Sequence, residues 1–199
     1  MQENKLICIC GLTGSGKSVV SDWLVKQGFG FFRFGQITLD IVKERSLEPT
    51  EENERPIREE IRKKHGMGAY AILNMPKIEL LLENGHVVGD GLYSWDEYKI
   101  LKEKYGDRFI LVAVYAPPKL RYERLSSREL ISSDTDLRNR PATKEQAKAR
   151  DYAEIENIAK AGPIAMADHT FINILDINNL IKQCEEYFAE FKEEKNGKL

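Results

Sequence analysis

The sequence of 199 residues has only three cysteines and no long apolar run. Its three cysteines cannot all pair, and Cys8 and Cys10 have no histidine or cysteine nearby to complete a metal site, so we expect both to be small buried hydrophobic residues. No apolar run is long enough to span a bilayer, and the polar residues 1–5 do not resemble a signal peptide. We therefore expect a cytoplasmic protein with no membrane partner.

The sequence also lacks a surplus of either charge. Lys and Arg number 30 against 32 Asp and Glu, which gives a formal net charge of −2. Proteins that bind duplex nucleic acid usually carry a basic surplus, so nucleic acid is not the partner we expect. The length and the hydrophobic content of 42% suit one domain over residues 1–199, as a monomer or a homodimer.

The most informative segment present is residues 11–18, which read Gly-Leu-Thr-Gly-Ser-Gly-Lys-Ser and match the phosphate-binding pattern G-x-x-x-x-G-K-[ST]. An apolar run at 6–10 precedes it, and a helical pattern follows it. Small residues let successive backbone N–H groups point at a phosphate, and the helix N-terminus adds positive potential. We expect these residues to bind a nucleotide: Gly11, Thr13, Gly14, Ser15, Gly16, Lys17, Ser18 and Val19.

Strand patterns alternate with helical patterns along the whole chain. The strands are expected at 6–10, 29–34, 86–90, 109–115 and 170–175. Strands that are apolar on both faces and alternate with helices predict an α/β fold, a five-stranded parallel sheet with helices on both faces. In such a sheet, ligands bind at the carboxyl ends of the strands.

Two helix boundaries are expected from local signals. Thr50 or Asn53 can cap a helix that accepts Pro56 only in its first turn. Thr143 starts a helix with a capping box, and we expect Gly162-Pro163 to end it.

Asp90 ends an apolar strand pattern and is followed by Gly91. If this strand neighbours the strand at 6–10, the Asp90 carboxylate lies beside the phosphate-binding loop. It can then hold Mg²⁺ together with Ser18, or accept a proton from the attacking group. The alternative is a turn-forming Asp-Gly pair without a chemical role.

Phosphoryl transfer needs positive charge around the moving group and protection from water. Six arginines follow the fourth strand pattern: Arg121, Arg124, Arg128, Arg138, Arg140 and Arg150. The first three share one helical face, and the others lie in or after a polar segment, so we expect a lid over residues 126–150. A solvated basic face is the alternative.

Four residues are the candidate catalytic groups: Lys17, Asp90, Arg124 and Arg150. Arg150 is directly followed by Asp151, and we expect that carboxylate to orient the guanidinium group while it still reaches a phosphate.

These segments together resemble nucleoside-monophosphate kinases with a P-loop. The resemblance includes residues 11–18, Asp90-Gly91, Arg121-x-x-Arg124-Leu125, Arg150-Asp151 and Ala167-Asp168. Leu47-Glu48-Pro49-Thr50 and His65-Gly66-Met67 are similar to an archaeal family described as adenylate-kinase-like or dephospho-CoA-kinase-like. The resemblance implies a P-loop nucleotide-kinase fold with a substrate-binding insertion at 36–68 and a lid, and the use of ATP and Mg²⁺.

Two positions depart from that family pattern. Gly35-Gln36-Ile37-Thr38-Leu39 has neither the acid nor the arginine of Gly-Asp-x-x-Arg, and Tyr93 stands where Asp-Gly-Ile-Arg ends. The resemblance implies that both missing arginines would grip the acceptor phosphate. Either another arginine replaces them or the acceptor is not an ordinary nucleoside monophosphate, and the candidates are Arg33, Arg45, Arg55, Arg58 and Arg62.

The leading hypothesis is an ATP- and Mg²⁺-dependent kinase that phosphorylates a small molecule, with a nucleotide as the favoured acceptor. A nucleotide-binding regulator or assembly ATPase and a dephospho-CoA kinase are the alternatives. A GTPase switch is disfavoured because the sequence has no Asn-Lys-x-Asp segment. The identity of the acceptor and the base preference of the donor stay open.

Overall fold

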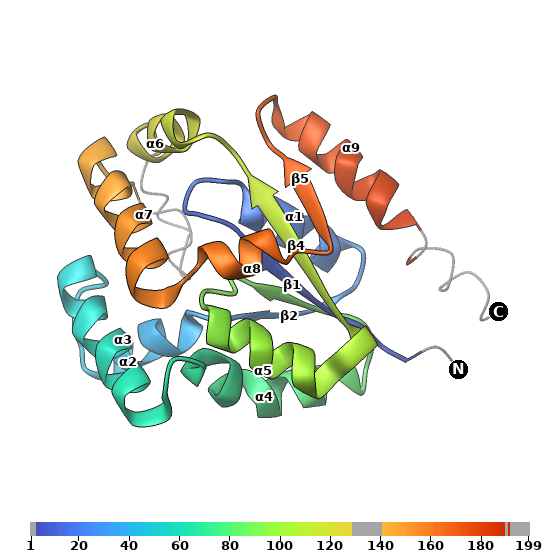
Figure 1. Ribbon diagram of the computed structural model, residues 1–199, viewed down its shortest axis with the longest axis horizontal. Helices are drawn as coiled ribbons and strands as arrows, with labels where there is room; N and C mark the ends of the chain where they lie inside the picture. The colour runs from blue at the N-terminus through green and yellow to red at the C-terminus, as the bar shows by residue number, and fades with distance from the viewer. Residues whose placement is uncertain (1–2, 129–140, 190, 192–199) are drawn as a thin grey trace.

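A computed structural model describes residues 3–128, 141–189 and 191. Its five strands are β1 (Leu6–Cys10), β2 (Gly30–Arg33), β3 (Val87–Asp90), β4 (Phe109–Tyr115) and β5 (His169–Ile172). They form one parallel sheet in the order β2-β3-β1-β4-β5, with β1 in the centre (Figure 1). The expected α/β class and the all-parallel five-stranded sheet are confirmed.

Nine α-helices surround the sheet in the described part of the chain. They are α1 (Lys17–Lys26), α2 (Gln36–Glu44), α3 (Glu51–His65), α4 (Ala69–Leu82), α5 (Trp95–Tyr105), α6 (Pro118–Ser126), α7 (Lys144–Ile158), α8 (Ala161–Ala165) and α9 (Ile177–Tyr187). A 3-10 turn at Gly106–Arg108 leads from α5 into β4. No described helix is both long enough and apolar enough to cross a membrane.

Alternation along β1 divides the hydrophobic core into two layers, because successive side chains of a strand point to opposite faces. Cys8 and Cys10 face the layer that α4 and α5 cover, whereas Ile7 and Ile9 face the layer that α1 and α9 cover. Both cysteines are fully buried and unpaired, and burial raises their pKa values. The expectation that they are buried hydrophobic residues is confirmed.

The expected position of Pro56 was wrong by about one turn. The hydroxyl of Thr50 accepts a hydrogen bond from the backbone N–H of Asn53 at 3.3 Å, and α3 begins directly after Thr50. Pro56 therefore lies in the second turn. Acidic residues in the first turn stabilise this early start through the helix dipole.

The expected end of the helix that Thr143 starts was also wrong. The capping box of Thr143 is present, but α7 ends at Ile158 because Ala159 adopts a left-handed conformation with φ 49°. Gly162-Pro163 lies inside α8, near its start, where proline is tolerated.

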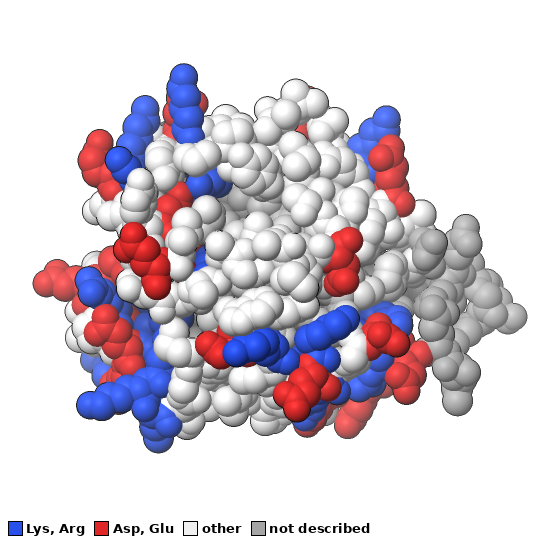
Figure 2. Space-filling view, in the orientation of Figure 1, with Lys and Arg blue, Asp and Glu red and all other residues white. Residues whose placement is uncertain are grey.

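The carboxyl ends of the strands meet at one edge of the sheet, and α3 and α7 face each other beside that edge (Figure 1). Of the lid expected at 126–150, residues 129–140, with Arg138 and Arg140, lie outside the described residues. On the face in Figure 2, charges of both signs are interleaved along the margins, and the middle carries few charges. The even charge balance of the sequence is therefore also a property of this surface.

Candidate active site

The loop after β1 depends on glycines with positive φ. Gly11 has φ 137° and Gly16 has φ 106°, a region that residues with a side chain rarely adopt. A Cβ atom at Gly11 would collide with the carbonyl oxygen of Val114, and one at Gly16 with the amide of Asn173. The sharp path of the backbone therefore requires both glycines.

Side chains from distant segments hold this loop in place. The amide of Asn173 donates to the carbonyl oxygen of Ser15 at 2.8 Å, and Arg121 donates to that of Thr13 at 3.0 Å. Arg121 also forms a bidentate ion pair with Asp151 at 2.9 and 2.6 Å, and both side chains are buried. This pair joins α6 to α7 beneath the loop.

Lys17, Ser18 and Asp90 line one cavity of about 510 Å³, together with Thr13, Gly14 and Gly16. We call it the loop cavity. Asp90 lies beside Ile9 in the register of β3 and β1, so the neighbouring strands on which its expected role depended are present. The ammonium group of Lys17 donates to the carbonyl oxygen of Leu12 at 3.1 Å.

Ser15, Val19 and Gly11 contribute to the conformation of the loop. Ser15 is buried, and its hydroxyl has no hydrogen-bond partner among the described residues. Val19 lies in the first turn of α1, where its N–H donates to the carbonyl oxygen of Gly16 at 3.0 Å and its side chain packs against the core. Gly11 shapes the entry to the loop from β1.

The electrostatic environment of Lys17 is unusual for a lysine. Burial and the nearby charge of Lys160 lower the pKa of Lys17 to about 7, although the carboxylates of Asp90 and Glu154 act in the opposite direction. An anionic phosphate beside Lys17 would favour its charged form. The site therefore suits a strongly anionic ligand.

A second cavity of about 510 Å³ adjoins the loop cavity, and we call it the arginine cavity. Its charged lining includes Arg33, Arg55, Arg58, Arg62 and Arg150, with Glu51, Glu54, Glu59 and Glu154. Arg33, Arg150 and Tyr93 line both cavities. The two cavities are therefore adjacent parts of one site.

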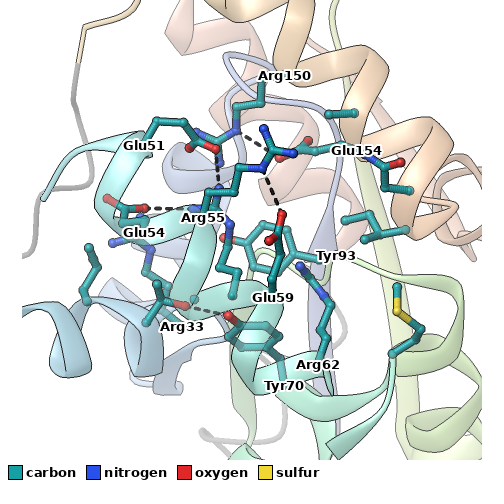
Figure 3. A pocket seen from close by; sticks show the side chains of 18 residues that line it. Arg33, Glu51, Glu54, Arg55, Glu59, Arg62, Tyr70, Tyr93, Arg150 and Glu154 are labelled. Atoms are coloured by element: carbon teal, nitrogen blue, oxygen red, sulfur yellow. Dashed lines mark hydrogen bonds and ion pairs between the residues drawn. The ribbon is translucent and has the colours of Figure 1, made fainter. Parts of the chain in front are cut away.

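Glutamates pair with three of the arginines (Figure 3). Arg55 bonds to Glu59 at 2.9 Å, and Arg150 bonds to Glu154 at 3.0 Å. Arg58 pairs with both Glu54 and Glu51. These pairs neutralise part of the charge on the wall.

Arg62 differs from these three, because no carboxylate of the described residues forms an ion pair with it. Its guanidinium carbon lies 5.3 Å from the centre of the Tyr70 ring, and its buried Nε has no hydrogen-bond partner in the described chain. Figure 3 shows Arg62 on α3 at the arginine cavity without a dashed contact. Arg62 is the arginine most available to an anion here.

The expected pairing of Arg150 with Asp151 was wrong. Adjacent residues of a helix point about 100° apart, so Asp151 faces α6 and pairs with Arg121, while Arg150 faces the cavities and pairs with Glu154. Burial would raise the pKa of Glu154, but Lys160 and Arg150 lower it to about 2. Glu154 is thus the carboxylate that orients Arg150.

Arg124 is not brought together with Lys17, Asp90 and Arg150, because it lines neither cavity. It donates to the side-chain oxygen of Asn173 at 3.3 Å, and burial lowers its pKa. Arg128 does line the loop cavity. Of the other arginines considered as replacements, Arg45 pairs with Glu60 at the surface.

Sequence reasoning missed Lys160 and Glu154. Glu154 carried a usable signal, because it lies four residues after Arg150 on the same helix. The sequence contains no such signal for Lys160, since nothing in the pattern around it indicates burial. Tyr93, noted in the sequence only as a departure from the family pattern, lines both cavities.

The donor set fits a magnesium ion bound with a nucleotide. Ser18 and Asp90 offer oxygen ligands to the same cavity, and Mg²⁺ prefers oxygen. The described residues contain no group of three or more His, Cys, Asp or Glu that could hold a metal. An ion at Ser18 and Asp90 would therefore take its other ligands from phosphates and water, as Mg²⁺ commonly does.

Comparison with known proteins agrees with this geometry. Residues 7–150 match the model of an AAA domain, so the loop and the sheet around it define a P-loop NTPase. The chain belongs to the UPF0200 family. It is 35% identical over 170 residues to a UPF0200 protein of Thermococcus gammatolerans, covering 84% of this chain and 85% of that one. UPF0200 protein TK1334 of Thermococcus kodakarensis is 33% identical, with 94% of each chain covered.

Solved structures of kinases share the fold. A shikimate kinase from Bacteroides thetaiotaomicron matches with a TM-score of 0.56 and 14% identity, covering 93% of this chain and 98% of that one. A gluconokinase from Sinorhizobium meliloti 1021 matches with a TM-score of 0.54 and 12% identity, and 98% of each chain is covered. The resemblance to P-loop kinases is thereby confirmed for the fold.

Proposed function

We propose that this protein is an ATP- and Mg²⁺-dependent phosphotransferase that moves the γ-phosphoryl group to a small anionic acceptor, with a nucleotide as the acceptor we favour. One observation supports the proposal above others: a phosphate-binding loop opens into a cavity that adjoins a second, arginine-lined cavity. A kinase needs two such compartments because donor and acceptor must meet with their reacting atoms aligned.

In this proposal the loop cavity holds the donor. The loop amides and Lys17 bind the phosphates, and Ser18 and Asp90 hold the magnesium ion, which would neutralise phosphate charge. Asp90 can alternatively take a proton from a hydroxyl acceptor. Arg150 lines both cavities and is placed to neutralise charge between them. Arg124 would act on the donor side, because it bonds to Asn173, which also holds Ser15.

The arginine cavity would hold the acceptor. Arg62 is our choice among the replacements for the arginines absent at Leu39 and Tyr93, because no glutamate among the described residues forms an ion pair with it. A guanidinium group matches phosphate or carboxylate oxygens in geometry and charge. The Tyr93 ring between the cavities offers a surface on which a base can stack, which favours a nucleotide.

The direct test measures ADP formation from ATP and Mg²⁺ across nucleoside monophosphates and dephospho-CoA. We expect at least one nucleotide to be phosphorylated, and Lys17→Ala to abolish the reaction. If no acceptor exceeds the Lys17→Ala background, the proposal is wrong. Saturation by dephospho-CoA but not by AMP or CMP would support the dephospho-CoA kinase alternative.

A nucleotide-binding regulator or assembly ATPase is the second candidate function. The observation that favours it is the internal pairing of Arg55, Arg58 and Arg150, which leaves much of the arginine cavity already neutralised. This alternative predicts ATP hydrolysis that a protein or RNA partner accelerates and that no small acceptor accelerates. Acceptor-dependent ADP release would exclude it.

A further inference from the structure

Lys160 is a buried lysine at the loop cavity. It follows Ala159, whose left-handed conformation ends α7, and it directly precedes α8. The residue is 1% exposed, yet it lines the loop cavity together with Lys17 and Asp90. The fold therefore places a second ammonium group beside the lysine of the phosphate-binding loop.

Three contacts fix this side chain. The ammonium group donates to Glu154 at 2.6 Å and lies 4.8 Å from the centre of the Tyr93 ring. The backbone N–H of Lys160 also donates to the carbonyl oxygen of Glu154 at 3.2 Å. A buried ammonium is costly unless it is paired, and Glu154 supplies that pair. Because an ammonium has three N–H donors, donors remain for a further acceptor.

Glu154 cannot neutralise this part of the site alone, because Arg150 bonds to its other oxygen. Lys17, Arg150 and Lys160 thus line the loop cavity near Asp90 and Glu154. The repulsion between Lys160 and Lys17 contributes to the lowered pKa of Lys17. An anion among the three cations would relieve that repulsion.

We propose that Lys160 is a catalytic residue whose ammonium group contacts the phosphoryl group during its transfer, with Glu154 as the positioning residue that aims it. This inference rests on the proposed kinase function and adds to it a catalytic residue from the junction of α7 and α8. Lys160 also lies against the ring of Tyr93, which lines both cavities.

The chemical step stays that of a simple phosphoryl transfer. The bond between the γ-phosphorus and the β–γ bridging oxygen breaks, and ADP leaves with that electron pair. An acceptor oxygen forms the new bond to the same phosphorus. A phosphate acceptor attacks as the anion, and a hydroxyl acceptor gives its proton to Asp90. Lys160 forms no covalent bond and transfers no proton in this step, since its role is to neutralise charge on the phosphoryl oxygens.

The test compares binding of Mg-ATP with binding of Mg-ADP-aluminium fluoride, a mimic of the phosphoryl group in transfer, by calorimetry. The variants are Lys160→Met and Lys160→Gln, both neutral, of which the second keeps a hydrogen-bond donor. Lys119→Met, at an exposed site on α6, is the matched control. We expect both neutral variants to bind Mg-ATP within about threefold of wild type and the mimic on the order of 100-fold more weakly.

Further readouts separate a catalytic role from a structural one. We expect kcat to fall on the order of 100-fold in both neutral variants while the KM for ATP stays constant, and Lys160→Arg to recover part of the loss. Equal weakening of Mg-ATP and mimic binding, or the failure of both neutral variants to fold, would overturn the proposal. If wild type binds both ligands but phosphorylates no acceptor, the kinase function fails, while a selective loss of mimic binding would still support the contact with the phosphoryl group.

Discussion

The loop cavity and the arginine cavity adjoin, yet the chain builds them differently. Residues 11–18 supply the glycine-rich wall of the first, and Asp90 joins them because β3 pairs with β1. The second is assembled from β2 and from helices α2, α3, α4 and α7, which are far apart in sequence. A local motif can therefore identify the glycine-rich wall of the loop cavity, whereas the arginine cavity exists only after folding.

The two cavities also differ in how their charges are balanced. Several arginine–glutamate pairs neutralise the arginine cavity, many of them partly exposed. The loop cavity has the buried Lys160 beside the partly buried Lys17, and it depends on the buried pair Arg121–Asp151 beneath the loop. We therefore expect substitutions on the loop side to have large effects and those on the acceptor side to have graded ones.

The largest effect should come from Asp151→Ala. The change leaves Arg121, which is 2% exposed, without its carboxylate, and breaking such a buried pair costs about 3–5 kcal/mol of unfolding free energy. Urea unfolding measures it. The control is Glu186→Ala, which removes an exposed pair with Lys182 and should cost about 0–0.5 kcal/mol. A loss below about 1 kcal/mol in Asp151→Ala would contradict the supporting role of this pair.

Lys17→Ala should come next, because it removes the charge that in our proposal faces the donor phosphates. Phosphoryl transfer should fall on the order of 100-fold or more, with weaker binding of Mg-ATP by calorimetry. Lys26→Ala, on the exposed last turn of the same helix, is the control and should behave as wild type. Similar activity in Lys17→Ala and Lys26→Ala would contradict the large effect that we expect from substitutions at the loop cavity.

Glu97→Gln tests the wall behind Tyr93. Glu97 is fully buried and accepts hydrogen bonds from the N–H groups of Tyr93 and Ser94. Burial raises its pKa from 4.5 to about 7, although these bonds and the charges of Arg62 and Lys160 oppose the shift.

The sign of the pH dependence follows from a raised pKa. The protonated carboxyl contributes fully to stability below about pH 4.5, and that contribution is lost as the pH rises through about 7. The loss reaches about 3 kcal/mol at most. Glu97→Gln should therefore be more stable than wild type at about pH 8.5, and this advantage should vanish near pH 5, as measured by chemical unfolding. Glu103→Gln, exposed on the same helix, should show no such difference, and a pH-independent effect of Glu97→Gln would contradict the prediction.

The smallest effect should come from Arg62→Ala on the acceptor side. If Arg62 binds the acceptor anion, the KM for the acceptor should rise about tenfold while the affinity for Mg-ATP stays unchanged. Arg45→Ala is the control, because Arg45 pairs with Glu60 at the surface and lines neither cavity. An equal change in both variants would show that Arg62 has no special role.

Much of the fold was predictable because its signals are local. The strands at 6–10 and 109–115 were predicted with the bounds that the structure shows, and the capping box expected at Thr143 is present. The errors at Pro56 and at Gly162-Pro163 have one cause. Both prolines were expected to set a helix boundary, but the Thr50 cap decided where α3 begins, and the backbone conformation of Ala159 decided where α7 ends.

The candidate site shows the same division. The loop and the neighbouring Asp90 followed from sequence, whereas the partner of Arg150 did not. Arg150 adjoins Asp151 in sequence, but in a helix their side chains point in different directions. Arg150 therefore pairs with Glu154 instead.

By itself, the sequence determined the parallel sheet, the glycine-rich loop and the expectation that this loop binds a nucleotide. The reason is that periodicity and short-range backbone geometry depend on neighbouring residues. Only the tertiary structure decided that Lys160 is buried at the loop cavity and that Arg62 has no ion pair with a described residue. Both facts depend on which helices pack against each other, and the spacing of residues along the chain does not predict that packing. The physical reason is that charge pairing acts through space and not along the chain.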